Sequence, residues 1–217
     1  MLRPCQLLEL GQVPYQTAWD WQRKLVEARI LDRSRPDLLL LLEHPAVYTL
    51  GQGADLSFVH FQPGEYELHR VERGGEVTFH GPGQLVGYPI LDLQNHRKDL
   101  HWYLRQLEEV LLLTLEQLDI PAERISGLTG VWSGGRKLGA IGIKVSRWVT
   151  MHGFSLNVNP NLNAFSQIIP CGLEHPVASI AEFYTDIQVG DVQPLLIAAF
   201  AQVFNRQLIP GNVFDWL

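Results

Sequence analysis

The spacing of apolar residues along the chain predicts both helices and strands. In residues 14–31 apolar side chains recur at steps of three and four, as in an amphipathic helix, and Pro14 suits its first position. Residues 38–42 are an unbroken run of leucines, typical of a strand that is covered on both faces. Residues 47–50 form a second short apolar run, which Gly51 ends. We therefore expect a helix followed by two strands.

The most distinctive stretch of the sequence is a glycine-rich segment at residues 73–89. Apolar and polar residues alternate in its V-T-F-H stretch, as on a short strand between two turns. Arg73 precedes this strand and His80 ends it, so a cation and an imidazole flank backbone that the glycines leave bare. A tight hairpin whose two polar residues face water is the alternative. Residues 84–93 predict a further strand.

The second half of the chain predicts a helix, then hairpins, then another helix. Asp99 is placed to cap a helix that runs to about residue 117. Its expected buried stripe consists of Leu100, Tyr103, Leu104, Leu107, Val110, Leu111 and Leu115. Residues 128–133 and 136–147 look like strands, and the Gly134-Gly135 pair between them favours a hairpin because its turn needs positive φ.

The remaining segments complete an α+β pattern. Residues 149–158 and 177–184 predict strands, and residues 191–208 predict a last helix with Pro194 in its first turn. Hairpins grouped between helices indicate mixed or antiparallel sheets with helices packed on their faces. The sequence has no repeat or low-complexity linker, so we interpret residues 1–217 as a single domain.

Composition and charge narrow the possible functions. With 46% apolar residues the chain can build a core, and its net charge of −6 argues against a nucleic-acid binder. We find neither a signal peptide nor an apolar run long enough for a bilayer, and we expect a cytoplasmic protein without a membrane partner. Two cysteines are too few for a disulfide framework or a cysteine-based zinc site.

Cys171 lies in I-P-C-G-L, where it is either a buried structural cysteine or a nucleophile. Pro170 and Gly172 would present the thiol at a bend and leave nearby N–H groups available to an oxyanion. A thiol with a pKa of about 8.5 needs a cation or base nearby. The candidates in glycine-rich, strand-like surroundings are Lys137, Lys144, Arg136, Arg147, His80 and His152.

Two lysines compete for this role. Lys137 and Lys144 are separated by an odd number of residues, so a regular strand places them on opposite faces. Lys137 directly precedes L-G-A-I-G-I, whose small residues would let a linear apolar ligand approach the backbone. A bulge at Gly139 or Gly142 would break this parity.

Metal and nucleotide sites find little support in the sequence. His80, His152, Cys171 and His175 lack the short spacings of zinc motifs, and a strand histidine bonded to a carbonyl is the simpler interpretation of His152. The segment G-P-G at residues 81–83 is not a dinucleotide fingerprint, and residues 130–137 do not match a phosphate-binding loop. We therefore expect no metal and no cofactor.

Three long motifs resemble one family. The segments R-G-G-E-V-T-F-H-G-P-G-Q-L-V-G-Y-P-I, R-K-L-G-A-I-G-I-K-V-S-R-W-V-T-M-H-G-F-S-L-N-V and P-C-G-L are similar to the lipoyl(octanoyl) transferases, and E-H-P-A-V-Y-T-L-G resembles an early strand of that family. The resemblance implies the fold shared with lipoate- and biotin-protein ligase catalytic domains. It also implies transfer of an octanoyl group from octanoyl-acyl carrier protein to lipoyl domains of 2-oxoacid dehydrogenases and glycine cleavage H protein.

The resemblance also assigns residues. Cys171 matches the family's acyl-thioester nucleophile and Lys137 its paired lysine. The positions that match acyl-binding segments are Arg73, Gly74, Gly75, Glu76, Val77, Thr78, Phe79, His80, Ala140, Ile141, Gly142, Gly153, Phe154 and Ser155. Phe79 replaces a common Tyr and Glu76 a common Gln, which would alter the pocket wall. An ATP-dependent lipoate or biotin ligase and a non-catalytic acyl-binding module are the competing hypotheses.

Overall fold

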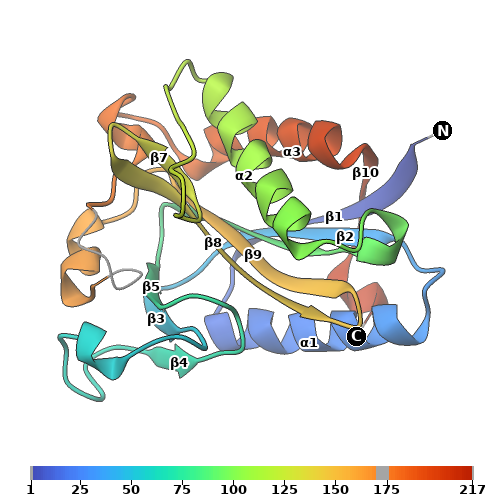
Figure 1. Ribbon diagram of the computed structural model, residues 1–217, viewed down its shortest axis with the longest axis horizontal. Coiled ribbons are helices and arrows are strands. Elements are labelled where there is room, and N and C mark those ends of the chain that lie inside the picture. The colour runs from blue at the N-terminus through green and yellow to red at the C-terminus, as the bar shows by residue number, and fades with distance from the viewer. Residues whose placement is uncertain (1, 170–175, 217) are drawn as a thin grey trace.

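The computed structural model describes residues 2–169 and 176–216. A seven-stranded sheet forms the centre of the molecule, with α1 on one side and α2 and α3 on the other (Figure 1). The helices are α1 (Tyr15–Leu31), α2 (Leu100–Glu116) and α3 (Val189–Phe204). Short 3₁₀ turns lie at Leu56–Phe58, Leu93–Asn95, Leu162–Gln167, Ile180–Glu182 and Val213–Asp215.

The central sheet has the strand order β10-β1-β2-β6-β9-β8-β7. Its members are β1 (Arg3–Gln12), β2 (Asp37–Glu43), β6 (Gln84–Ile90), β7 (Val131–Ser133), β8 (Arg136–Ser146), β9 (Val149–Asn157) and β10 (Arg206–Pro210). Strand β1 runs parallel to β2 and β10, and the other neighbours are antiparallel. A second sheet has the order β4-β3-β5, from β3 (Val47–Leu50), β4 (Leu68–Arg70) and β5 (Val77–His80).

The leucine run of β2 explains why the sheet is covered on both faces. Leu39 and Leu41 pack in the hydrophobic core beneath α2 and α3, whereas Leu38 and Leu40 pack in the core beneath α1. Each of these side chains is fully buried, and burying one leucine contributes about 1.5–3 kcal/mol. The prediction of a strand covered on both faces is therefore confirmed.

Two local predictions are also confirmed. The side chain of Asp99 accepts a hydrogen bond from the Trp102 amide at 3.0 Å and so caps α2. Gly134 and Gly135 have φ of 54° and 75° and join β7 to β8 as an antiparallel hairpin. The α+β fold class follows from these elements and matches the prediction.

Several boundaries differ from the prediction because tertiary contacts override the local pattern. Strands β1, β4 and β10 were not predicted. The helix expected at residues 191–208 begins at Val189 and ends at Phe204, because Asn205 adopts a left-handed conformation (φ 52°) and the chain continues as β10. Pro194 accordingly lies inside α3, beyond its first turn.

Three smaller predictions were wrong. Residues 177–184 form a single bridge at Val177 and then a 3₁₀ turn, in which the Glu182 carboxylate accepts from the Ser179 amide. Pro14 caps α1 instead of occupying its first position. Leu100 is exposed because it begins α2, before the helix reaches the sheet.

No helix in the described part of the chain combines the length and apolar character that crossing a membrane requires.

Candidate active site

The guanidinium of Arg73 holds the glycine-rich loop before β5 in place. Its Nη2 atom donates to the carbonyl and the hydroxyl of Thr49, both at 2.8 Å, and to the carbonyl of Glu76 at 2.9 Å. Nη1 donates to the Gly74 carbonyl at 3.1 Å. Arg73 is buried, so these bonds compensate for the loss of solvent around its charge. The cation thus shapes the loop from within.

The same loop lies directly on β8. The Gly74 amide donates to the Ile143 carbonyl at 2.9 Å. A Cβ atom on Gly142 would lie 3.0 Å from Cδ of Arg73 and 3.2 Å from the Gly74 carbonyl oxygen. Only glycine therefore lets the loop and the strand approach each other this closely.

The loop, β5, β8 and β9 enclose a narrow cavity. Its wall is formed by Tyr15, Arg73, Gly75, Glu76, Val77, Thr78, His80, Tyr88, Ala140, Ile141, Gly142, His152, Gly153, Phe154 and Ser155. Every residue that the sequence assigned to acyl binding lies in this wall except Gly74 and Phe79. Gly74 instead lines an adjoining cavity of about 310 Å³, which shares Gly75, Glu76 and residues 140–142 with the first.

Phe79 points away from this cavity. Its ring lies 5.1 Å from Tyr48 and 5.5 Å from Phe165, within a hydrophobic cluster on the other face of β5. Phe79 therefore does not line this cavity, whereas its neighbours Thr78 and His80 do, as alternation along a strand places them on the opposite face. Glu76 does line the cavity, and its carboxylate accepts from the Asp55 amide at 3.3 Å.

Sequence reasoning missed two aromatic residues in the wall. Tyr15 is contributed by the first turn of α1 and Tyr88 by β6. The Tyr88 hydroxyl lies 2.8 Å from Nε2 of the buried His44, and His44 Nδ1 lies 2.7 Å from the Val13 carbonyl. Each tyrosine stands beside a helix start or a proline, but no periodicity in the sequence marks it as a cavity residue.

His80 is neutral and holds one fixed tautomer. Burial above all, together with His44 nearby, lowers its pKa to about 3. The Asn157 amide nitrogen donates to the Ala178 carbonyl at 3.0 Å, so Asn157 Oδ1 must accept from Gln84 Nε2 at 2.9 Å. Gln84 Oε1 is then the acceptor for His80 Nδ1 at 2.7 Å. The proton therefore sits on Nδ1, and Nε2 carries a lone pair.

His152 occupies a strained position in β9. Its φ is +57°, a conformation that non-glycine residues rarely adopt, and its amide donates to Gln22 Oε1 at 2.7 Å. Its Nε2 atom lies 3.8 Å from the Glu72 carboxylate, which accepts from Trp19 Nε1 at 2.9 Å. Burial lowers the pKa of His152. The bond to a neighbouring carbonyl that the sequence suggested is not the interaction observed for this ring.

Lys137 lies at the start of β8, beside the Trp132 ring and in the walls of two cavities. Its side chain is 9% exposed, and Nζ stands 4.7 Å from the centroid of the Trp132 ring. It lines the 310 Å³ cavity and a small cavity that also includes Thr78, Ala140 and Ser155 of the narrow cavity wall. Its amide donates to the Pro176 carbonyl at 2.9 Å, and its carbonyl accepts from Ala178 at 2.9 Å.

A bulge in β8 breaks the alternation of faces expected between Lys137 and Lys144. Trp132 pairs with Lys137 and Val131 with Gly139, so Leu138 is an extra residue in β8. Leu138 is buried in the core beneath α2. A side chain at Gly139 would point into the same core, because its Cβ would lie 2.8 Å from Leu111. Because of this bulge, the odd separation of Lys137 and Lys144 does not determine on which face of the sheet each side chain lies. Lys144 lines none of the cavities described here.

Cys171 and His175 lie outside the described residues, and so does the predicted bend around the thiol. The other cysteine, Cys5, is fully buried in the main core, and burial raises its pKa far above the ordinary value of a thiol. Cys5 is therefore a structural residue. Among residues 2–169 and 176–216, no three histidines, cysteines or acidic residues are grouped to hold a metal ion.

Comparison with known proteins places the chain among enzymes of lipoate metabolism. The family described as lipoyl protein ligase A/B catalytic domain matches residues 14–201. An octanoyltransferase of Gloeobacter violaceus is 61% identical over 207 residues, which is 95% of this chain and 93% of the relative. An octanoyltransferase of Synechocystis sp. is 60% identical over 217 residues, covering 98% and 96% of the two chains.

Solved structures share the fold at much lower identity. A putative lipoate protein ligase from T. acidophilum with bound lipoic acid superposes with a TM-score of 0.77 at 17% identity, covering 96% of this chain and 89% of the other. Lipoate-protein ligase A bound with ATP gives a TM-score of 0.75 at 17% identity, covering 98% and 92%. The predicted fold is thereby confirmed. The chain belongs to the lipoyl protein ligase A/B catalytic-domain family and, within it, to the octanoyltransferases, which are acyltransferases.

Proposed function

We propose that this octanoyltransferase takes the octanoyl group from octanoyl-acyl carrier protein, carries it as a thioester on Cys171, and transfers it to the target lysine of lipoyl domains. The acceptors we propose are the lipoyl domains of 2-oxoacid dehydrogenases and the glycine cleavage H protein. The proposal rests on the octanoyltransferase relatives and on the P-C-G-L motif. We also propose that residues 1–217 act as a single catalytic domain.

The observation that carries the proposal is the narrow cavity together with the adjoining cavities that Lys137 lines. The wall of the narrow cavity combines glycine backbone and apolar side chains with the charged Arg73 and Glu76 and with two imidazoles whose pKa values are lowered by burial. A linear acyl chain would meet no titrating charge from His80 or His152 in such a wall. Thr78, Ala140 and Ser155 are shared with the small cavity beside Lys137, so an acyl chain lying along β8 would bring its carbonyl end toward this amine.

In the first step Lys137 removes the thiol proton of Cys171, and the thiolate attacks the carbonyl carbon of the donor thioester. The tetrahedral intermediate collapses by breaking the bond to the carrier sulfur. That sulfur leaves as a thiolate and takes the proton back from the Lys137 ammonium. The products are octanoyl-Cys171, neutral Lys137 and the carrier thiol.

In the second step the neutral amine of the acceptor lysine attacks octanoyl-Cys171. Neutral Lys137 accepts the proton that the attacking amine loses, and the bond to the Cys171 sulfur breaks. The amide is released, and the enzyme is left with a thiolate–ammonium pair, which can begin the next cycle. Backbone N–H groups at positions 171 and 172 are the proposed oxyanion donors. His80 is not, because its Nδ1 proton is used on Gln84 and its Nε2 has none.

Carrier protein is acidic, so a basic surface should guide it. The sequence offers Arg97, Lys98, Arg136, Lys144 and Arg147 for this purpose. Two of them are already paired, Arg97 with Asp99 at 3.1 Å and Arg136 with Glu182. We therefore propose that Lys98, Lys144 and Arg147 attract the donor, and that the rate falls as salt is raised.

Intact mass after incubation with octanoyl-acyl carrier protein tests the mechanism. Wild-type protein and Cys5→Ala should gain one octanoyl group, and hydroxylamine should remove it as expected for a thioester. Cys171→Ala should gain none and should not octanoylate a lipoyl domain. An adduct on Cys171→Ala, or normal turnover by it, would refute the thioester proposal.

The same assay distinguishes the proposed reaction from that of an ATP-dependent ligase, which shares this fold. A ligase would transfer free octanoate in the presence of ATP and would not require Cys171. We expect no transfer from octanoate and ATP, with or without a lipoyl domain. Transfer under those conditions would replace the proposed reaction with ligation.

A further inference from the structure

A second cavity, of about 430 Å³, shares no lining residue with the cavities around Lys137. It is formed by the start of β1, the end of α1 with the loop that follows, the start of β2, the 3₁₀ turn at Leu93–Asn95 and β10. Its lining residues are Arg3, Pro4, Arg29, Arg33, Ser34, Arg35, Pro36, Asp37, Asn95, Arg206 and Ile209. Five arginines and one acidic residue therefore face the same space.

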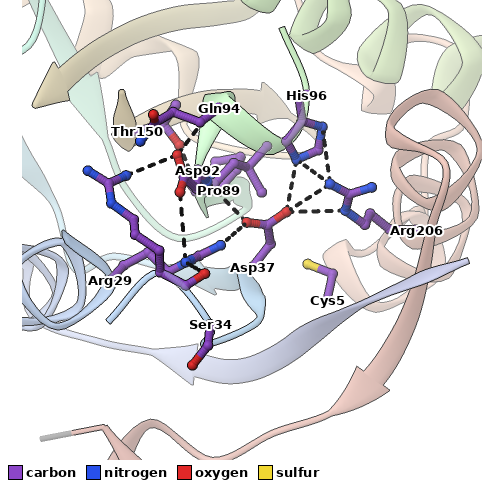
Figure 2. A network of polar contacts seen from close by, with 12 residues as sticks. Cys5, Arg29, Ser34, Asp37, Pro89, Asp92, Gln94, His96, Thr150 and Arg206 are labelled. Carbon is purple, nitrogen blue, oxygen red and sulfur yellow. Dashed lines mark hydrogen bonds and ion pairs between the residues drawn. The ribbon is translucent and has the colours of Figure 1, made fainter. Parts of the chain in front are cut away.

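The innermost arginines neutralise buried carboxylates (Figure 2). Arg206 donates to Asp37 Oδ2 from Nε and Nη2, both at 3.1 Å, and His96 Nε2 lies 2.8 Å from the same oxygen. Arg29 Nη2 approaches Asp37 Oδ1 at 3.4 Å, and its Nη1 donates to the Arg33 carbonyl at 2.6 Å. Asp37, Arg29 and Arg206 are all buried, so this part of the network belongs to the fold itself.

The outer arginines exceed the carboxylates available to them. Arg33 contacts the buried Asp92 at 3.0 Å, which satisfies the second acidic residue. Arg35 has a distant ion pair with the exposed Asp32, at 3.8 Å, and its guanidinium lies 4.7 Å from the centroid of the Trp216 ring, which leaves its charge without a close carboxylate. Arg3 has no acidic group within ion-pair distance in the described part of the chain. The cavity is thus locally positive in a protein whose net charge is −6.

Two buried nitrogens in this cluster have no hydrogen-bond acceptor among the described residues, Nε of Arg29 and Nη1 of Arg33, although the second forms an ion pair with Asp92 at 3.0 Å. Arg29 is only 2% exposed. Buried polar groups are normally satisfied, and an unsatisfied one suggests that an acceptor is supplied from outside. Arginine forks match the oxygens of phosphate groups, and a cavity of one sign concentrates ions of the other.

From this arrangement we propose that the cavity lined by Arg3, Arg29, Arg33 and Arg35 binds a small molecule that carries a phosphate group. The phosphate oxygens accept from the outer arginines, whose positive charge is not balanced by the two buried aspartates. The Asn95 amide and the Ser34 hydroxyl lie at the rim. Pro4, Pro36 and Ile209 supply an apolar wall for the organic part of the ligand. A cavity of this volume is within the usual range for small-molecule sites.

Calorimetric titration of the full chain with inorganic phosphate and with AMP tests this proposal, with sodium chloride of equal ionic strength as the reference. The variant Arg3→Gln/Arg35→Gln removes two outer arginines and leaves the buried network intact. Arg70→Gln/Arg97→Gln is the matched control, because it makes the same change of charge at two exposed arginines elsewhere, of which Arg97 pairs with Asp99 and Arg70 has no ion pair among the described residues.

We expect saturable binding of both probes at one site per chain, and tighter binding of AMP because it adds contacts with the apolar wall. Arg3→Gln/Arg35→Gln should weaken binding by about tenfold or more, as expected for lost charge-assisted hydrogen bonds, and the control should bind as wild type does. Tighter binding of free phosphate than of AMP would identify the ion itself as the ligand. Binding that does not exceed the chloride reference, or that both double variants weaken equally, would overturn the proposal.

Binding at the acyl site must be distinguished from this site. Saturating octanoate should leave the phosphate affinity unchanged, because the two cavities share no residue. Competition between octanoate and phosphate would place the anion beside Lys137 or Arg73 and would refute the second site. None of these measurements requires acyl transfer, so failure here leaves the proposed reaction untouched.

Discussion

Nδ1 of His80 lies 2.7 Å from Oε1 of Gln84, and the bonds beyond Gln84 determine that its oxygen, an acceptor, faces the ring, so that Nδ1 carries the proton. Gln84 Nε2 donates to Asn157 and to the Phe79 carbonyl, so only its oxygen faces the imidazole. His80 is therefore an acceptor toward the cavity. It can receive a hydrogen bond from an ammonium or amide group there, but it cannot donate one to an oxyanion.

Replacing Gln84 should change the protonation of His80. In Gln84→Glu a carboxylate would stand 2.7 Å from the imidazole, and this charge would favour the imidazolium. We expect the pKa of His80 to rise from about 3 by at least about one unit. Nitrogen-15 NMR of the histidine rings measures this, with the exposed His60 as an internal reference. An unchanged His80 titration would mean that Gln84 does not contact the ring in solution.

Three buried histidines, His44, His80 and His152, have lowered pKa values and should make the protein sensitive to acid; the shifts of His44 and His80 are large. Burial lowers the pKa of His80 to about 3 and that of His44 to about 4, from 6.5. Between about pH 6.5 and 4 the unfolded chain binds protons at these positions that the folded chain does not, so the free energy of unfolding falls as pH falls. The two groups together contribute a slope of up to about 2.7 kcal/mol per pH unit.

Urea denaturation at several pH values measures this slope. His44→Gln should give a shallower dependence between about pH 6.5 and 4 than wild type does, because one of the two groups no longer titrates. His60→Gln is the matched control, since His60 is exposed, and its curve should run parallel to that of wild type. Parallel curves for all three proteins would show that the buried histidines are not the source of the pH dependence.

Lys137→Met should abolish acyl transfer while the protein remains folded. The change keeps the length and apolar stem of the side chain but removes the amine that the mechanism uses in both steps, so we expect a loss of kcat by about 100-fold or more. The loss of the contact with Trp132 should cost about 1–2 kcal/mol of stability. Turnover measured with a lipoyl domain, and thermal unfolding, provide the two readouts.

Lys144→Met supplies the comparison for Lys137. Lys144 is on the same strand but lines none of the cavities described above, so this variant should retain wild-type turnover at high salt. At low salt its KM for carrier protein should rise modestly, as expected for a charge that attracts the donor. Equal losses of kcat in the two variants would argue against a specific role for Lys137.

The sequence was sufficient to predict an element where one residue type determines the local conformation. The leucine run of β2 and the paired glycines before β8 predicted their elements because burial on two faces and positive φ each leave few alternatives. Strands β1, β4 and β10 escaped prediction because their half-exposed residues lack a clear period and are ordered by pairing with distant segments.

The residues of the candidate site likewise divide into those that the sequence reveals and those that only the fold brings to the cavity. Arg73 and the glycines around it stand out in the sequence, because a charge embedded in bare backbone is unusual. Tyr15 and Tyr88 do not, since they reach the cavity only through the packing of α1 and β6. The proton position on His80 depends on the Ala178 carbonyl, at the end of a chain of side-chain amides that no sequence pattern reveals. The bulge at Leu138 likewise needs the observed register.

Gly142→Ala should weaken octanoate binding and lower the stability of the protein. The new methyl group would lie 3.0 Å from Cδ of Arg73 and 3.2 Å from the Gly74 carbonyl oxygen, so the loop must shift away from β8 by a few tenths of an ångström or more. Because Arg73 and Gly75 both line the narrow cavity, this shift alters its wall. We expect octanoate binding to weaken by about tenfold and stability to fall by about 1–3 kcal/mol.

Gly190→Ala is the control for Gly142→Ala. A methyl group at Gly190, in the first turn of α3, meets nothing within 4 Å, so octanoate binding should be unchanged and stability equal or slightly higher. If Gly142→Ala binds octanoate as wild type does, the acyl chain does not lie against this part of β8, and the cavity assigned to it must be abandoned.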